Sequence, residues 1–271
     1  MKVYLQTDIE GIAGFCFFEN RKDASVENFH HRQRMRRLLT NEVNAAAKAA
    51  FRAGAAEVII NDNHGAGYNI LFEELDPRCR IIHGRNGSGP HWLPLFTECD
   101  VMVLVGMHAM GGTPVSITPH SLWKVNDGAL YLSEASMAAA IAGDHGIPVV
   151  FASGDDKVTA ELAAKIPGIS TVVTKQALAP FMACSLIPAR ACELIGEAVE
   201  RALRAPAFPA PFVIPGPVTL TLLDSANHAP PLAELKPAVT ADTIEQAFLQ
   251  YERDMPWSCG NQQLPDGFVY P

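Results

Sequence analysis

The sequence has 271 residues, of which 48% are hydrophobic and 18% are charged, which is enough apolar material for the core of one large domain or two modest ones. Its net charge of −8 argues against nonspecific binding to nucleic acid, and the one basic cluster, at residues 32–37, has the pattern of a solvated helix face. No apolar run reaches the roughly 18 to 20 residues that cross a bilayer, so we expect no contact with a membrane.

The cysteines and the first residues of the chain indicate in which cellular compartment the protein resides. The six cysteines are dispersed and never form a Cys-x-x-Cys pair, which argues against a zinc ribbon and against a secreted disulfide framework. The first eight residues reach a charged side chain after a very short apolar stretch, unlike the apolar centre of a signal peptide. We therefore expect a cytoplasmic protein.

Strands and helices are predicted to alternate through the first 155 residues. Runs rich in valine and isoleucine predict buried strands at residues 3–7, 58–60, 101–105 and 149–152. Residues 28–52 carry apolar side chains at helical spacing before Gly54, and Ser133 can cap an alanine-rich helix that begins at Glu134. This alternation predicts an α/β fold with a mostly parallel central sheet flanked by helices.

The last third of the chain has a different pattern. Residues 188–204 predict a helix, and residues 205–217 are rich in proline. Beyond them, residues 218–223 alternate like a strand and residues 241–252 like an amphipathic helix. We therefore predict an α/β domain at residues 1–204 and a smaller C-terminal α+β unit at residues 218–271, joined by the connection at 205–217.

Three of the predicted strands end in residue types that bind metals. The first runs into Asp8 and Glu10, whose carboxylates point the same way in an extended segment. The second runs into His64, the third into His108, and Glu134 can add a third carboxylate. Ligands bind beyond the carboxyl ends of strands in open α/β sheets, and mixed nitrogen and oxygen donors suit zinc, manganese or cobalt. Taken singly, Asp8 is better explained as a turn or cap residue and each histidine as a structural hydrogen-bonding residue, so it is their coincidence at one predicted edge that favours a metal site.

Several segments around these residues carry recognisable motifs. Residues 8–14 read Asp-Ile-Glu-Gly-Ile-Ala-Gly, residues 58–64 end in Asn-Asp-Asn-His, residues 106–109 read Gly-Met-His-Ala, and residues 119–121 read Pro-His-Ser. The motifs resemble those of the D-aminopeptidase family of binuclear zinc peptidases, and Glu134 falls where that family has its last carboxylate ligand. The resemblance extends from Met1 to about residue 195 and is looser beyond it.

The resemblance implies a role for each of these side chains. Asp8 would bridge two zinc ions per chain, and His120 would be the catalytic histidine. The ligands that complete the two zinc sites would be Glu10, His64, His108 and Glu134. Residues 111–119 are one residue longer than the family pattern, which leaves the placement of His120 open. Asp62, Asp155, Asp156 and Lys175 stand near strand ends, where capping or support of ligands is as reasonable as catalysis.

The implied reaction is hydrolysis of amide bonds in short peptides, with removal of N-terminal amino acids, D-amino acids among them, by a hydroxide that bridges the two metals. A hydrolase of another small amide or of a phosphate ester is an alternative, although the loops that follow the strands contain few cations besides Arg85 and Lys124. A noncatalytic zinc protein is another alternative, but structural zinc sites are usually closed and rich in thiolates.

The family also suggests a homo-oligomer, with a ring-based decamer among its forms. Phe15, Phe17, Phe18 and Trp92 either pack between subunits or belong to the core.

Overall fold

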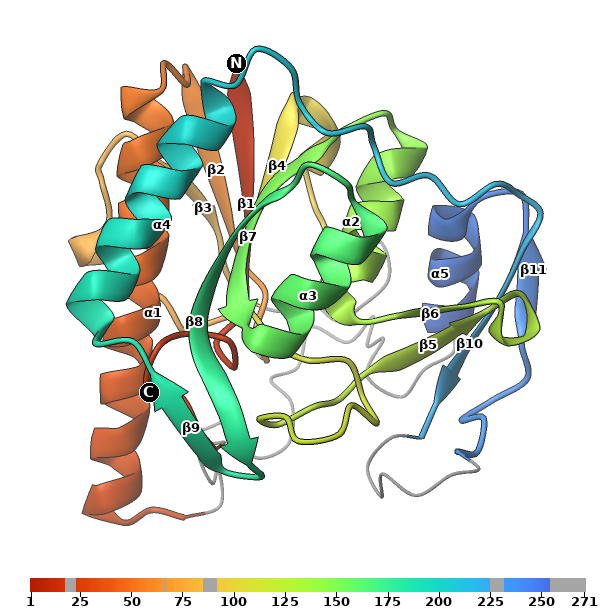
Figure 1. Cartoon of the computed structure of the whole chain (residues 1–271), viewed down its shortest axis with the longest axis horizontal. Helices are drawn as coiled ribbons and strands as arrows, with labels where there is room; N and C mark the ends of the chain where they lie inside the picture. The colour runs from red at the N-terminus through yellow and green to blue at the C-terminus, as the bar shows by residue number, and fades with distance from the viewer. Residues whose placement is uncertain (18–22, 66, 85–91, 225–231, 254–271) are drawn as a thin grey trace.

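A computed structural model of the chain describes residues 1–17, 23–65, 67–84, 92–224 and 232–253. Its main sheet has seven strands in the order β3-β2-β1-β4-β7-β8-β9, and all neighbours are parallel except β8 and β9 (Figure 1). In that order the strands are Arg80–Ile82, Glu57–Asp62, Lys2–Thr7, Val101–Met107, Val149–Asp155, Ser170–Ala179 and Met182–Ser185. The predicted α/β class with a mostly parallel sheet is confirmed.

Helices cover both faces of this sheet. On one face α1 (Val26–Arg52) packs along α4 (Pro188–Leu203), and on the other lie α2 (Glu134–Asp144) and α3 (Asp156–Lys165) (Figure 1). Ser25 caps α1 by accepting a hydrogen bond from the backbone N–H of Asn28, and Pro188 opens α4. Each face therefore closes its own apolar core, and β1, β4 and β7 are buried between the two.

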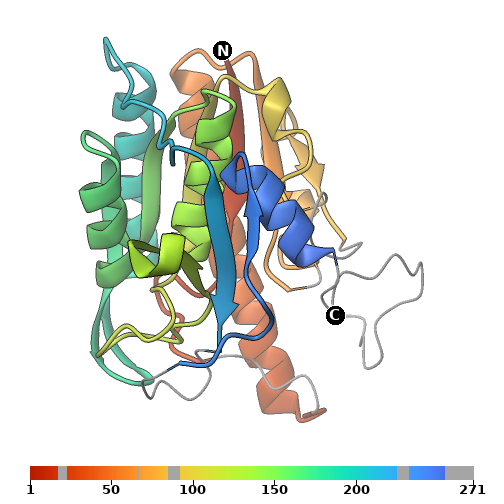
Figure 2. The same ribbon diagram turned by 90° about the vertical axis from the view of Figure 1, so that its right-hand side faces the viewer.

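A second, antiparallel sheet has the order β11-β10-β5-β6. Its strands are β5 (Leu122–Val125), β6 (Leu130–Leu132), β10 (Val218–Leu223) and β11 (Val239–Ala241), and α5 (Ile244–Glu252) packs on them. Figure 2 shows α5 and this small sheet in front of the main sheet. Short 3-10 turns occur at Phe72–Glu74, Phe96–Glu98 and Asn126–Gly128.

The small sheet joins residues from both sides of the proline-rich segment at 205–217. Strand β10 pairs with β5, with Leu220 opposite Val125 and Leu223 opposite Leu122. The division into units at 1–204 and 218–271 stays a prediction, but the sheet that contains β10 also contains strands from residues 122–132. Within the described ranges, no helix is both long and apolar enough to cross a membrane.

The backbone of the segment that follows β1 passes unusually close to the backbone at the end of β4. The backbone N–H of Gly11 donates to the carbonyl of Gly106, and the N–H of Asp8 donates to that of Val105. A Cβ atom on Gly106, where φ is +77°, would lie 2.1 Å from the carbonyl oxygen of Asp8. Glycine is therefore required at position 106 for two reasons: a larger side chain would collide with the backbone of Asp8, and the positive φ disfavours other residues.

We expect Gly106→Ala to lower the free energy of unfolding by more than about 3 kcal/mol, since the new methyl group collides with backbone that has no room to move. Gly146→Ala is the matched control, because its φ is +71° and nothing lies within 4 Å of its Cβ position. The control should lose only about 1 to 2 kcal/mol, from strain at positive φ. Urea unfolding measures both changes, and equal losses would contradict the collision.

Candidate metal centre

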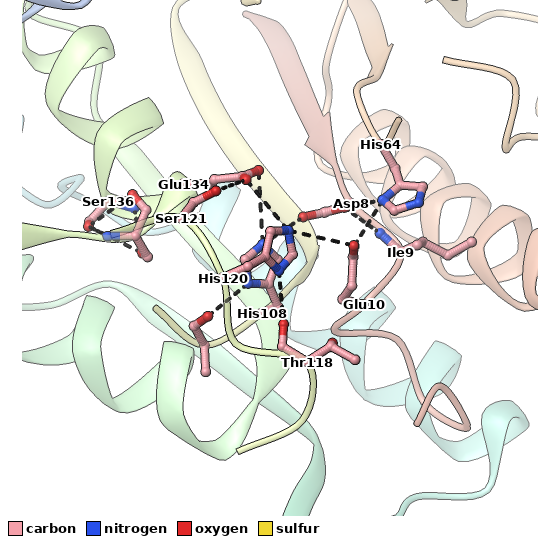
Figure 3. A network of polar contacts seen from close by, with 12 residues as sticks. Asp8, Ile9, Glu10, His64, His108, Thr118, His120, Ser121, Glu134 and Ser136 are labelled. Atoms are coloured by element: carbon pink, nitrogen blue, oxygen red, sulfur yellow. Dashed lines mark hydrogen bonds and ion pairs between the residues drawn. The ribbon is translucent and has the colours of Figure 1, made fainter. Parts of the chain in front are cut away.

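Parallel pairing brings the carboxyl ends of three neighbouring strands to one edge of the main sheet. Thr7 at the end of β1 stands opposite Asp62 at the end of β2 and opposite Val105 near the end of β4. The segments that follow these strands carry Asp8, His64 and His108, so residues distant in sequence become neighbours. All the predicted ligand residues meet at this edge (Figure 3).

One cluster of possible metal donors consists of Asp8, Glu10 and His64. The Nδ1 atom of His64 lies 3.1 Å from Oδ1 of Asp8 and 3.0 Å from Oε2 of Glu10. Both carboxylates are buried, and the backbone N–H of Ile9 donates to Oδ1 of Asp8. The two carboxylates thus face the same imidazole, but residues 8–11 form a bend and turn after β1 and not the extended segment on which the sequence argument rested.

The second cluster consists of His108, His120 and Glu134. The two imidazole rings stack, with their centroids 3.8 Å apart and their planes inclined by 12°. His108 places Nδ1 2.8 Å from the carbonyl oxygen of Ala109, and His120 places Nδ1 2.9 Å from that of Thr118. With Nδ1 as the donor in each ring, both Nε2 atoms face the carboxylates of the centre.

Two carboxylates connect these clusters. Oδ2 of Asp8, whose other oxygen faces His64, lies 3.4 Å from Nε2 of His108. Oε1 of Glu10 lies 3.8 Å from Nε2 of His120. Asp8 therefore stands between His64 of one cluster and His108 of the other.

Glu134 is oriented by the segment that carries His120. The hydroxyl of Ser121 donates to Oε1 of Glu134 at 2.6 Å, and the same oxygen lies 3.7 Å from Nε2 of His120. Thr118 and Ser121 adopt positive φ values of +43° and +56°, which are unusual for residues other than glycine. The longer loop at 111–119 thus still delivers His120 to the centre, and strained backbone of this kind is typical of functional sites.

The carboxylates of the centre stabilise positive charge on its buried histidines. Burial alone would lower the pKa of His64, yet Glu10 and Asp8 beside it raise this pKa well above its ordinary value. Burial also opposes charge on His108, but Glu134 and Asp8 raise the pKa of His108 to about 10. The site thus has the electrostatic character that a cation requires.

His120 differs from His108 in exposure and in electrostatics. The side chain of His120 is 37% exposed, whereas that of His108 is 1% exposed. Burial of the ring and the adjacent His108 both lower the pKa of His120. His120 is therefore the histidine of this pair that solvent, or a substrate, can reach.

The donor atoms fit a metal ion. Within the described residues, the buried Nε2 atoms of His64 and His108 have no hydrogen-bond partner. Leaving buried polar atoms unpaired costs about 1 to 3 kcal/mol each, so such atoms need an explanation. Three carboxylates and two imidazoles form the oxygen-rich and nitrogen-rich donor set that suits zinc or a similar divalent ion, with no thiolate among them.

Comparison with known proteins now identifies the family. The model of peptidase family M55, described as D-aminopeptidase, matches residues 1–256. The chain belongs to the D-aminopeptidase family. A D-aminopeptidase from Bacillus subtilis (strain 168) is 30% identical over 210 residues, which are 75% of this chain and 74% of that protein. The predicted family is confirmed.

A solved structure agrees with this assignment. The zinc-dependent D-aminopeptidase DppA from Bacillus subtilis, described as a self-compartmentalizing protease, superposes with a TM-score of 0.78 at 26% identity. The match covers 94% of this chain and 99% of that one. The likeness thus extends over almost the whole chain and is not confined to the main sheet.

In this member of the D-aminopeptidase family, the other polar residues predicted near strand ends form hydrogen bonds with backbone groups. Asp62 accepts hydrogen bonds from the backbone N–H groups of Asn69 and Ile70, which shapes the loop after His64. Asp155 caps α3 and also accepts from the N–H of Ala109, next to His108. Asp156 accepts from the N–H of Ala177. Lys175 donates to carbonyl groups in the loop at residues 8–14.

The aromatic residues that the sequence analysis singled out have different environments. Phe15 is fully buried in a core cluster, and Trp92 packs against Phe248. Phe17 is half-exposed and stacks on His31. Phe18 lies outside the described residues.

Sequence reasoning missed Glu42, a fully buried carboxylate in the middle of α1. Its Oε1 accepts a hydrogen bond from the backbone N–H of Ala13 at 2.8 Å, so it holds the same loop that carries Asp8 and Glu10. Its position between Leu39 and Val43, on the apolar side of the helix, is the signal that could have found it.

Burial raises the pKa of Glu42 to about 7, so ionising it in the folded protein is unfavourable. A raised carboxyl pKa gives stability that is present below the unfolded pKa of 4.5 and is lost as pH rises through 7. We expect Glu42→Gln, which keeps an acceptor for Ala13, to be more stable than the parent by about 3 kcal/mol at pH 8 and by less than about 1 kcal/mol at pH 5. Urea unfolding in the presence of a chelator measures this difference, and a pH-independent difference would contradict it.

Proposed function

We propose that the protein is a zinc-dependent aminopeptidase that hydrolyses the N-terminal amide bond of short peptides and accepts D-amino acids at that position. The observation that carries the proposal is the pair of donor clusters with Asp8 between them, on the fold of a zinc-dependent D-aminopeptidase. A cluster of buried carboxylates that all face imidazole nitrogens destabilises the fold unless its charge is compensated. A bound cation therefore explains this cluster better than a contribution to stability does.

The two clusters divide the proposed ligands between two zinc ions. Glu10 and His64 would hold one ion, His108 and Glu134 would hold the other, and Asp8 would serve both. Bound zinc would polarise a carbonyl group and would lower the pKa of a coordinated water to about 7. The hydrogen bond from His108 to Ala109 fixes the ring so that Nε2 faces the centre, which is the support that ligand histidines generally receive.

His120 is the proposed catalytic histidine. Its Nδ1 is held by the carbonyl of Thr118, so Nε2 is the atom that can accept a proton from water or give one to the leaving amine. Its greater exposure allows contact with a substrate, and its stacking on His108 keeps the ring beside the proposed ligands. Ser121, which follows it directly, holds Glu134 and so couples the positions of both side chains.

Elemental analysis and a peptide assay test this function. We expect about two zinc ions per chain, with cleavage of D-Ala-D-Ala that is lost on treatment with a chelator and restored by zinc. L-Ala-L-Ala serves as the stereochemical control, and an equal or faster rate on it would overturn the preference for D-amino acids. One ion per chain would contradict the division of ligands, and no bound zinc after its addition would remove the metal centre.

We further propose a cytoplasmic homo-oligomer, with a ring-based decamer as the form to test. The solved relative is described as self-compartmentalizing, which supports an assembly of chains. Here the β8–β9 hairpin exposes Leu178, Phe181 and Met182 by 52, 66 and 57%, and subunit contact would cover such side chains. Sedimentation equilibrium measures the assembly, and a monomer would contradict it without affecting the metal centre.

A further inference from the structure

Two side chains of strand β8 contact the backbone of the loop at residues 8–14. The ammonium group of Lys175 donates to the carbonyl oxygen of Glu10 and, at 2.9 Å, to that of Ile12. The hydroxyl of Thr174 donates to the carbonyl oxygen of Gly11, which lies between them in sequence. Three successive carbonyl groups of the loop are therefore held by two adjacent residues of one strand.

This contact spans much of the main sheet. Strand β8 is separated from β1 by β4 and β7, and neither Lys175 nor Thr174 belongs to the two donor clusters. The side chain of Thr174 also donates to the carbonyl of Gly154 at the end of β7. The loop that carries Asp8 and Glu10 is thus fixed to a strand that supplies neither of those side chains.

Burial of a lysine ammonium group is expensive unless charge and hydrogen bonds compensate for it. Lys175 is 1% exposed, and burial lowers its pKa to about 8 despite the nearby carboxylates of Asp155 and Glu42. Its ammonium group also lies 5.4 Å from the ring centre of Phe15, within the range of a cation–π contact. A neutral apolar residue would fill the same volume without the desolvation cost of a buried ammonium group, so packing alone does not explain the lysine.

The position of Glu10 indicates what the ammonium group of Lys175 does. Its carbonyl oxygen is bound by Lys175, while its side chain faces His64 and His120. Asp8 lies two residues earlier in the same segment. Fixing the backbone at residues 10–12 therefore fixes the direction in which the Glu10 carboxylate leaves the chain, and with it the distance from Glu10 to Asp8, whose own N–H is held by the carbonyl of Val105.

We propose that Lys175, assisted by Thr174, is a positioning residue that sets Asp8 and Glu10 at the separation that zinc binding requires. The inference rests on the proposed function, because it assigns the two carboxylates to zinc. Lys175 touches no substrate and acts only through the loop. Supporting groups of this kind typically change metal affinity or activity by 10- to 100-fold when they are removed.

The test measures zinc affinity by competition with a chelator in Lys175→Met, which keeps the length of the side chain and removes the charge. We expect the affinity to fall 10- to 100-fold. The visible absorption spectrum of the cobalt-substituted protein should also change, because it reports the geometry of the ligands. Thr174→Val, which is nearly isosteric, should lose a smaller factor of about 3- to 10-fold and decides the question if Lys175→Met does not fold.

Leu162→Ala is the matched control for lost stability. Leu162 is fully buried in α3, so its truncation should lower the midpoint of urea unfolding while zinc affinity and the cobalt spectrum stay unchanged. Wild-type affinity and spectrum in a folded Lys175→Met, or in Thr174→Val where the first variant does not fold, would overturn the positioning role. A wild-type chain that binds no zinc would instead overturn the proposed function.

Discussion

Asp8→Asn should lower kcat/KM for D-Ala-D-Ala at least 1000-fold, an effect of about 4 kcal/mol, and should reduce bound zinc below two ions per chain. Asp8 is the carboxylate that faces both His64, at 3.1 Å, and His108, at 3.4 Å. An amide keeps the size of the side chain but removes the negative charge and one of the two oxygen donors. Both proposed zinc sites should therefore weaken together.

A buried carboxylate outside the centre provides the control. Asp76→Asn removes the negative charge of a buried side chain that is bound by Arg78, so it should leave zinc content and kcat/KM unchanged. Elemental analysis and steady-state kinetics report the two quantities separately. An Asp8→Asn protein that keeps two zinc ions and more than a tenth of the parental kcat/KM would remove Asp8 from the position that both ions share.

His120→Ala should lower kcat about 100- to 10 000-fold and leave the zinc content at the parental value. This expectation separates a catalytic histidine from a metal ligand, which is the choice that its place beside His108 and Glu134 leaves to experiment. The side chains of the proposed ligands His64 and His108 are only 10% and 1% exposed, whereas the side chain of His120 is 37% exposed. A proton-transfer role fits that exposure.

His145→Ala is the matched control, since His145 pairs with Glu245 on α5 and takes no part in the donor clusters. Its kcat should equal that of the parent. Zinc measurements and kcat must be made on the same preparations of both variants. Loss of zinc in His120→Ala would assign this residue to the ligand set and would overturn its catalytic role.

The main sheet was predictable because its central strands are buried on both faces. Runs such as residues 101–105 are apolar throughout, and helices at 26–52 and 134–144 have clear capping signals. Their order along the chain predicts parallel strands, and parallel strands bring their carboxyl ends to one edge. The meeting of Asp8, His64 and His108 followed from that rule, whereas their roles as ligands stay predictions.

Strand β8 escaped prediction for a physical reason. It places Lys175 in the core while exposing Val173 by 45%, so its hydrophobic pattern is the reverse of what an outward-facing lysine suggests. The pairing of β5 with β10 also escaped, because strand partners about 95 residues apart leave no local pattern in the sequence. Support for the loop by Glu42 and Thr174 escaped for the same reason, because these residues lie 29 and 163 residues from the loop residues that they contact.

The pairing of β5 with β10 has a consequence for any attempt to shorten the protein. His120 and Ser121 directly precede β5, and one edge of β5 is hydrogen-bonded to β10. A fragment that stopped at the proline-rich segment would leave that edge of β5 without a neighbour, and an open edge of this kind invites aggregation. The minimal catalytic fragment must therefore extend beyond Leu223, even though all the proposed metal ligands lie in the first half of the chain.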